Sequence, residues 1–531
     1  MALASKNASN NKNKSRDALA KQLAEISQSM NALREENVEL KRQLDWFKRQ
    51  LFGPKSEKRI DPNPYQMSLG EEFAAPVDPD EEPEKETISY ERGKARKHRP
   101  DDCVTDSGLR FDDSVPVKTI TLPILGIEGL SEDDYDIIDV KKTYRLAQRP
   151  ASYVVLCYEQ PVIKLKRTKD ILSAIMLANV LERSLADVSF LVGLMVDKFQ
   201  YHLPLYRQHQ RLSAAGITLS RATLTSLVRR GIELLQPIVD AQRESVLRSR
   251  VLAMDETPIK AGKSKKRKGK MHQGYFWPIY GDRDEIVFTY SDSRARRVIE
   301  QLLNDQFTGT LLSDGYRAYA SYVAKTDAVS HAQCWVHTRR QFFEAEQDEP
   351  VLVEEMLERI AELFRLEAHC KAHALEGEIK REHRITWSKP VVDGIVERVQ
   401  ELQQRRALLP SSPFTKALAY LSNRVAALRV FLEEPDVPLD TNHLERELRS
   451  IPMGRKAWLF CWTELGAEHV GVIQSLISTC RLHGIDAYTY LTDVLLRISI
   501  HPNRDIAQLT PRLWKQHFAD NPMRSDLMLD V

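Results

Sequence analysis

A run of apolar segments between residues 247 and 345 constrains the fold most strongly. Strands are expected at 250–254, 274–280 and 285–290, followed by a helix over 295–303. A strand ending at Asp314, a short helix and a strand through 331–337 complete the pattern. Strands alternating with helices in this way predict an α/β sheet. We expect Asp255 and Asp314 to lie at neighbouring strand ends in that sheet.

Three acidic residues stand in distinctive local sequences. Asp255 follows the apolar run at 251–254, Asp314 follows the one at 310–313, and Glu445 opens a helix in the segment 441–446. Three converging carboxylates can hold two divalent cations about 4 Å apart, which is the arrangement used in phosphoryl transfer. Ligation by oxygen alone suits Mg²⁺ or Mn²⁺ rather than zinc. The sequence therefore predicts a metal-dependent enzyme that cuts or joins nucleic acid.

Each of these residues also has a purely structural interpretation. Asp314-Gly315 is a common turn dipeptide, Asn442 with Glu445 fits a helix capping box, and Asp255 can simply end a strand. For each residue taken singly, the structural interpretation is favoured. For the three residues taken together, the metal site is favoured. Glu256 would point to the opposite face of its strand and is a weaker ligand candidate.

Several longer motifs carry a family resemblance. They are Met-Asp-Glu-Thr at 254–257, Ser-Asp-Gly-Tyr at 313–316, Cys-Trp-Val-His-Thr-Arg-Arg at 334–340, Asn-His-Leu-Glu-Arg at 442–446, Gly-Arg-Lys-Ala-Trp-Leu-Phe at 454–460, Ser-Leu-Ile-Ser-Thr-Cys at 475–480, and, upstream, 51–58 and 202–208. Together they resemble the insertion-sequence-66 (TnpC-like) family of DDE transposases over about residues 20–510.

The resemblance implies an RNase H-like catalytic core, which the order of strands and helices also fits. It implies that Asp255, Asp314 and Glu445 are the catalytic residues and the ligands of Mg²⁺ or Mn²⁺. The expected reaction is cleavage and strand transfer at the ends of an insertion sequence. The expected partners are transposon-end and target DNA and other proteins encoded by the same element.

The N-terminal region is expected to mediate self-association. Residues 1–15 are rich in Asn, Lys and Ser and are expected to be disordered. In the segment 16–52, apolar residues from Leu19 to Leu51 alternate at spacings of four and three, which predicts a coiled coil. Asn37 occupies an a position, where a buried Asn favours a two-stranded pairing. The alternative is an amphipathic helix packed on its own domain. The Pro-rich, charged stretch 53–98 predicts a linker.

Residues 99–167 contain short β-branched runs that predict a small β module. In the resembling family this region carries a Cys-x-x-Cys zinc-binding pair at each end. Here Asp106 stands three positions after Cys103, and no second pair follows Cys157. Structural zinc needs four thiolate or imidazole ligands, so we expect a degenerate module without zinc.

The pattern over 168–246 is helical and resembles a helix-turn-helix. Gly216 would supply the turn and Ser220 would cap the second helix. That helix would present Arg221, Arg229 and Arg230 to DNA. The alternative is an ordinary helical hairpin.

Further basic residues near the carboxylates are candidates for DNA contact. They are the loop residues Lys263, Lys265, Lys266, Arg267, Lys268 and Lys270, the group His337, Arg339 and Arg340, and Arg446, Arg449, Arg455 and Lys456 after Glu445. A solvated loop and surface salt bridges with Glu447 are the alternatives. Cys334 is expected in the core, because a strand alternates its side chains and cannot turn His331, Cys334 and His337 to one ion.

The rest of the chain is expected to divide into a first core part (247–345), a helical insertion (346–438), a second core part containing the catalytic Glu (439–500) and a C-terminal tail (501–531). Lys and Arg total 77 against 75 Asp and Glu, so a DNA surface must be a local patch. Six scattered cysteines and the absence of a long apolar run predict a cytoplasmic, nucleoid-associated protein.

Two other functions fit parts of the sequence. A non-catalytic DNA-binding regulator derived from a transposase would use only the coiled coil and the helix-turn-helix. An RNase H-like nuclease would cut DNA without joining it. The three carboxylates count against the regulator, and the long N-terminal region counts against the nuclease.

Overall fold

The computed structural model describes residue 30 and residues 109–528, except for gaps at 126, 128–129, 150–151, 177, 265–269, 305, 406–408, 460 and 462. Apart from Met30, the segments expected as disordered, coiled coil and linker lie outside these residues, as does Cys103. Within the described part of the chain, no helix is long and apolar enough to cross a membrane.

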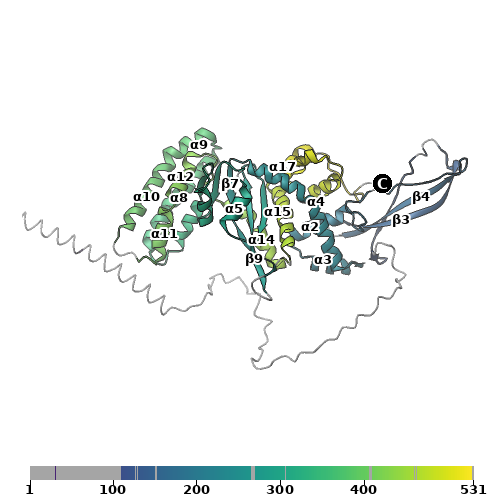
Figure 1. The fold of residues 1–531 in the computed structure, drawn as a ribbon, viewed down its shortest axis with the longest axis horizontal. Coiled ribbons are helices and arrows are strands. Elements are labelled where there is room, and N and C mark those ends of the chain that lie inside the picture. The colour runs from purple at the N-terminus through teal and green to yellow at the C-terminus, as the bar shows by residue number, and fades with distance from the viewer. Residues whose placement is uncertain are drawn as a thin grey trace, which may run out of the picture.

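The central sheet has the strand order β10-β9-β7-β11-β12, with β8 paired to β9. Its strands are β7 (Val251–Met254), β8 (Thr257–Lys263), β9 (Met271–Gly281), β10 (Ile286–Ser291), β11 (Thr310–Ser313) and β12 (Ser330–Gln333). β7, β9 and β10 are antiparallel neighbours, whereas β7, β11 and β12 run parallel. The crossovers contain α5 (Arg296–Leu303) and α6 (Arg317–Val323). Figure 1 shows this sheet in the middle of the molecule.

β8 was not expected from the sequence. The basic run from Lys263 was expected in a loop directly after the first strand, but Thr257–Lys263 form a further strand that pairs with β9 as a hairpin. Its side chains alternate, with Ile259 buried and both Pro258 and Lys260 exposed. The basic run from Lys263 therefore begins at the end of a strand.

Two long helices pack on the antiparallel half of the sheet and fix it through buried polar contacts. These are α4 (Arg221–Leu247) and α15 (Glu464–Leu482). Gln242 of α4 donates to Ile286 O at 2.8 Å, and Phe288 N donates to Ser475 Oγ of α15 at 2.8 Å. Gly471 allows α15 to approach, because a Cβ there would lie 2.5 Å from Phe288 O.

The region before the sheet contains a second β structure and three helices. The strands β2 (Val117–Thr121), β3 (Tyr135–Arg149), β4 (Ser152–Leu165) and β5 (Ile171–Ser173) form a sheet whose long β3–β4 hairpin projects from the body (Figure 1). α2 (Val188–Phe199) and α3 (Leu205–Ala214) precede α4. Gly216 has φ +77° between α3 and α4, and Ser220 Oγ accepts from Thr223 N at 3.0 Å to cap α4. A short pair, β1 (Arg110–Phe111) with β6 (Ile217–Thr218), joins this turn to the chain before β2.

A group of helices follows the central sheet in the sequence and precedes Glu445. It comprises α8 (Pro350–Ala372), α9 (Gly377–His383), the π-helix η2 (Arg384–Ser388), α10 (Lys389–Gln403), α11 (Pro413–Ser422) and α12 (Val425–Glu433). Figure 1 shows these helices packed together at one end of the molecule. α12 contacts β12, and α11 contacts α7 (Trp335–Phe343), so the helices adjoin the parallel half of the sheet.

The segment after residue 500, expected as a tail, folds back on the body. It contains η3 (Asn503–Leu509) and α17 (Pro511–His517), and Trp514 is buried. Trp514 Nε1 donates to the buried Asp493 of α16 (Ala487–Arg497) at 2.7 Å. Beyond α17, Tyr158 in β4 donates to Asp526 at 2.8 Å, so the last described residues join the body to the small sheet.

Candidate active site

The parallel register of β7 and β11 brings Asp255 and Asp314 together. Ala253 of β7 pairs with Leu312 of β11. Two residues further along each strand come Asp255 and Asp314, at the same level. Neighbouring strands lie about 4.8 Å apart, so both carboxyl groups stand at one edge of the sheet.

Glu445 approaches this edge from α13 (Asn442–Leu448), which begins beside the end of β12. Thr441, the residue before α13, donates from its hydroxyl to Cys334 Sγ at 3.4 Å, and Cys334 directly follows β12. Trp335 N donates to Leu439 O at 3.0 Å. Because β12 neighbours β11, these contacts deliver the first turn of α13 to the strand ends that carry the two aspartates.

The capping box expected from Asn442 and Glu445 is not formed. Thr441 occupies the N-cap position of α13 without a side-chain capping hydrogen bond, and Asn442 instead contacts Asp440. The Glu445 carboxylate accepts from Thr441 Oγ1 at 3.3 Å and lies 3.7 Å from His337 Nε2. The structural interpretation of Glu445 as a helix cap is therefore wrong.

The electrostatics of Asp255 reflect its burial and the acidic residues around it. The pKa of Asp255 is raised to about 8, first by burial and then by the charge of Glu256. A hydrogen bond from Glu256 N opposes this rise, whereas the charges of Asp314 and Glu445 add to it. A buried carboxylate among other carboxylates is unfavourable unless a cation or a proton neutralises it.

The donor set fits a hard divalent cation, because it consists of carboxylate oxygens with little competing nitrogen or sulfur. The side chains do not form a closed ligand cage as they stand. Among the described residues, no group of three or more His, Cys, Asp or Glu side chains is arranged to hold one metal ion. Both aspartates instead accept hydrogen bonds from nearby backbone, Asp255 from Glu256 N at 2.7 Å and Asp314 from Tyr316 N at 2.8 Å.

Glu256 is turned away from this group and has its own partners. Its side chain is 1% exposed, accepts from Arg294 Nε at 2.6 Å and accepts from Tyr319 OH at 2.7 Å. The sequence indicated the turn away from Asp255 but gave no sign of Arg294, which lies 38 residues further along the chain.

The strand expected through 331–337 ends early. β12 stops at Gln333, and His337, Arg339 and Arg340 lie on α7. The chain leaves the sheet because Trp335 is buried and donates from Nε1 to Leu428 O at 3.0 Å. The alternation argument about His331, Cys334 and His337 was therefore wrong. Cys334 is nevertheless buried, as expected, and His337 lies beside Glu445, whereas Arg339 and Arg340 are exposed.

The other basic candidates have varied surroundings. Lys263 and Lys270 are exposed at the ends of the β8–β9 hairpin, and 265–268 lie outside the described residues. Arg446, Arg449 and Lys456 are exposed, and Arg455 donates to Pro258 O at 2.6 Å. Glu447 does not pair with its neighbours, because its buried carboxylate binds Arg481 of α15.

The helix-turn-helix arginines lie on the first half of α4. Arg221 contacts the Tyr206 ring, Arg229 pairs with Glu233 at 3.2 Å, and Arg230 donates to Glu182 O at 3.1 Å. All three therefore have contacts within the chain, and the structure does not bring them to the carboxylates.

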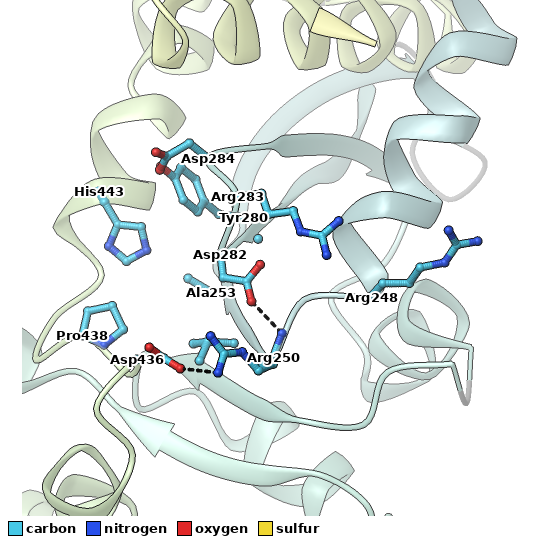
Figure 2. A pocket seen from close by; sticks show the side chains of 12 residues that line it. Arg248, Arg250, Ala253, Tyr280, Asp282, Arg283, Asp284, Asp436, Pro438 and His443 are labelled. Atoms are coloured by element: carbon cyan, nitrogen blue, oxygen red, sulfur yellow. Dashed lines mark hydrogen bonds and ion pairs between the residues drawn. The ribbon is translucent and has the colours of Figure 1, made fainter. Parts of the chain in front are cut away.

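A separate cavity of about 600 Å³ opens near the start of β7, at the end of the strand opposite Asp255. It is lined by residues of both charge signs, including Arg248, Arg250, Arg283, Asp282, Asp284 and Asp436. Figure 2 shows Asp436 and Asp282 both directed at Arg250. Asp436 pairs with the Arg250 guanidinium at 2.9 Å, and Asp282 accepts from Arg250 N at 2.8 Å. His443 closes one side and contacts the Tyr280 ring edge-on, with 4.8 Å between ring centroids. This contact anchors α13 to the sheet two residues before Glu445, a role that the sequence did not indicate.

Comparison with known families gives three matches along the chain. The model described as "Transposase IS66 family" matches residues 183–469, and the "IS66 C-terminal element" matches residues 475–512. A model described as "Transposase C of IS166 homeodomain" matches residues 39–103. The first match alone covers more than half of the chain and includes all three carboxylates.

Three proteins of Sinorhizobium fredii, named as uncharacterized, are similar to this chain. Protein y4hP is 31% identical over 360 residues, which is 63% of this chain and 63% of that protein. Protein y4jD is 25% identical over 496 residues, covering 89% of this chain and 94% of that protein. Protein y4qI is 26% identical over 398 residues, or 71% of each. The chain thus spans slightly less than two thirds of y4hP but nearly all of y4jD.

Proposed function

The chain belongs to the IS66 family of transposases, and we propose that it cleaves and joins DNA at the ends of an insertion sequence. Asp255, Asp314 and Glu445 are the proposed catalytic residues and metal ligands. The family is one of DDE enzymes with an RNase H-like core, and such enzymes use divalent metal.

The observation that carries the proposal is the register of β7 and β11. It brings two aspartates from separate motifs to one level at adjacent strand ends. Glu445 joins them from α13, and its charge acts on Asp255 together with that of Asp314. The contacts of Glu445 with Thr441 and His337 argue against a capping role for this residue. The contacts of Glu256 with Arg294 and Tyr319 argue against a ligand role for Glu256.

In the proposed reaction, a water oxygen attacks a phosphodiester at the element end, and the released 3′-oxygen gains a proton. That 3′-hydroxyl then attacks a phosphodiester of target DNA, so one bond forms as another breaks. Two Mg²⁺ or Mn²⁺ ions, when bound, supply activation of the attacking and leaving oxygens. The three carboxylates hold the ions, and Thr441 and His337 orient Glu445.

Exposed basic residues around the site would hold the DNA backbone. Arg446 lies on α13 after Glu445 and Arg449 directly follows that helix. Arg339 and Arg340 lie on α7, and Lys263 and Lys270 flank the turn of the β8–β9 hairpin. Contacts of this kind neutralise phosphate and make binding strongly dependent on salt. We further propose that the helix-turn-helix arginines contact DNA and that a coiled coil over 16–52 mediates self-association. Other proteins of the same element are the remaining proposed partners.

A strand-transfer assay tests the proposal. The purified chain is incubated with Mg²⁺ and duplexes that carry the DNA flanking its own gene. We expect nicked ends with free 3′-hydroxyls and, later, those ends joined to a second duplex. Binding without any cleavage in Mg²⁺ or Mn²⁺ would support the regulator, and cleavage without joining would support the nuclease.

A further inference from the structure

The two candidate metal-binding aspartates are each held by one backbone N–H group. Glu256 N donates to Asp255 Oδ1 at 2.7 Å, and Tyr316 N donates to Asp314 Oδ1 at 2.8 Å. The position of each carboxylate therefore depends on the residue that supplies its donor. Whatever fixes Glu256 relative to Tyr316 also fixes the two aspartates relative to each other.

Arg294 contacts both of these residues. It lies between β10 and α5, and its Nε donates to the buried Glu256 carboxylate at 2.6 Å. Its guanidinium also covers the Tyr316 ring, with Cζ 4.0 Å from the ring centroid. The Tyr316 hydroxyl donates to Arg294 O at 2.7 Å, which closes the contact from the other side.

Neighbouring contacts hold the bridge that Arg294 forms between Glu256 and Tyr316. Tyr319 donates to the second Glu256 oxygen at 2.7 Å and packs edge-on against Trp277. Trp277 Nε1 donates to the carbonyl of Ser293, the residue before Arg294, at 3.3 Å. Arg294 is thus fixed at its backbone and at its guanidinium.

We propose that Arg294 is a positioning residue that sets the separation of Asp255 and Asp314 by joining the loops that carry them. The inference rests on the proposed function for its consequence, which is correct spacing of the metal ligands. Arginine suits the task because one planar group can bond a carboxylate at its edge and cover an aromatic ring with its face. A lysine can pair with Glu256 but cannot reproduce both contacts.

The test compares Arg294→Met, Arg294→Lys and Arg297→Met. Arg297 is an exposed arginine at the start of α5, three residues after Arg294, and controls for lost positive charge. Arg294→Lys keeps a charge opposite Glu256, so it provides a folded variant if Arg294→Met proves unstable. Tyr316→Leu removes the ring and should behave like Arg294→Met.

Two measurements distinguish the structural role of the Arg294 bridge from the proposed metal-dependent reaction. Hydrogen exchange at the Glu256 and Tyr316 amides reports the coupling without metal or DNA, and exchange at both should quicken together in Arg294→Met. Mn²⁺ titration followed by electron paramagnetic resonance should show affinity reduced about 10–100-fold, as for other residues that orient metal ligands. Arg294→Lys should lie between wild type and Arg294→Met, and Arg297→Met should match wild type.

Unchanged exchange at both amides in Arg294→Met would overturn the inference. Wild-type Mn²⁺ affinity in Arg294→Met would also overturn it. The same holds if DNA binding falls equally in Arg294→Met and Arg297→Met while exchange at both amides stays constant. If both amides exchange faster but wild type neither binds Mn²⁺ nor cleaves DNA, the bridge stands and the proposed function fails.

Discussion

The Tyr420 hydroxyl lies against Gly315, the residue that follows Asp314, so closely that a Cβ at Gly315 would lie 2.3 Å from it. Tyr420 belongs to α11, more than 100 residues further along the chain. Arg424, one turn later, covers the Tyr420 ring at 3.8 Å and donates to Gly315 O at 3.0 Å. The helices inserted before Glu445 therefore touch the loop that carries a candidate catalytic aspartate.

Gly315→Ala should push α11 and the Asp314 loop apart. Overpacking of this kind costs about 1–3 kcal/mol, and we expect a lower unfolding midpoint and slower DNA cleavage with nearly normal DNA binding. Differential scanning calorimetry and single-turnover cleavage measure the two effects.

The control for that substitution is Gly394→Ala on α10, where the nearest atom to an added Cβ is 3.7 Å away. It should leave cleavage near wild type and leave stability equal or up to about 1 kcal/mol higher, because alanine favours a helix interior over glycine. Combining Gly315→Ala with Tyr420→Leu should recover part of the loss, because the two residues share one contact. Full stability and activity of Gly315→Ala alone would show that the loop tolerates displacement.

Asp255→Asn, Asp314→Asn and Glu445→Gln should each abolish cleavage and joining while leaving folding and DNA binding largely intact. Each change keeps the size of the side chain and removes a charge that the metal ions require. Combined substitutions should lose little more than single ones, because the ligands act as a unit. Activity should require Mg²⁺ or Mn²⁺ and fail in Ca²⁺, which binds oxygen ligands with looser geometry.

Asp292→Asn, which changes an exposed carboxylate after β10, is the matched control and should cleave normally. Wild-type cleavage by all three ligand variants would exclude the proposed metal site. The turn interpretation of Asp314 would then be preferred.

The ion pair between the buried Arg384 and the partly buried Glu367 should stabilise the inserted helices in a pH-dependent way. Arg384 is fully buried and donates to Glu367 at 2.6 and 3.0 Å and to Phe431 O at 2.7 Å, which joins α8 to the end of α12. Burial alone would raise the pKa of Glu367, but the hydrogen bonds and charge of Arg384 lower it overall. A lowered folded pKa means that the stabilisation is present above the ordinary value of 4.5 and is lost as pH falls below it.

Arg384→Met should therefore destabilise these helices at neutral pH by about 1–3 kcal/mol, because it removes the buried donor to Glu367 and Phe431 O and leaves only Lys380, at 3.0 Å, opposite the Glu367 carboxylate. Hydrogen exchange of α8 and α12 amides measures the effect, and the difference from wild type should shrink below pH 4.5. Arg381→Met is the comparison, since Arg381 pairs with exposed carboxylates, and it should change exchange much less. An equal effect of both substitutions would argue against a special role for the Arg384–Glu367 pair.

Removing residues 1–52 should lower the oligomeric state if the seam from Leu19 to Leu51 forms a coiled coil. Asn37→Leu should change partner number or register rather than abolish pairing, because a buried Asn specifies both. Analytical ultracentrifugation of the full chain and both variants measures this. An unchanged mass after truncation would place self-association elsewhere.

Local sequence was sufficient where a single residue follows an uninterrupted apolar run. The segments before Asp255 and Asp314 are buried strands, β7 and β11, because four consecutive apolar or small residues suit a central strand covered on both faces. Ser220 caps α4 as expected, since capping depends only on residues three apart. The helix expected at Glu445 is α13, with Glu445 in its first turn.

Tertiary structure decided the features that depend on distant residues. The apolar run after His331 looked like a strand, but burial of Trp335 against α12 turned it into α7. Glu256 gained its partners from residues 38 and 63 positions away, and Gly315 was fixed by a tyrosine on an inserted helix. Periodicity reports which faces of an element are apolar, whereas the choice between strand and helix in a short apolar run depends on what covers it. Contacts between loops leave no local pattern at all, because their energy arises only when the chain has brought both ends together.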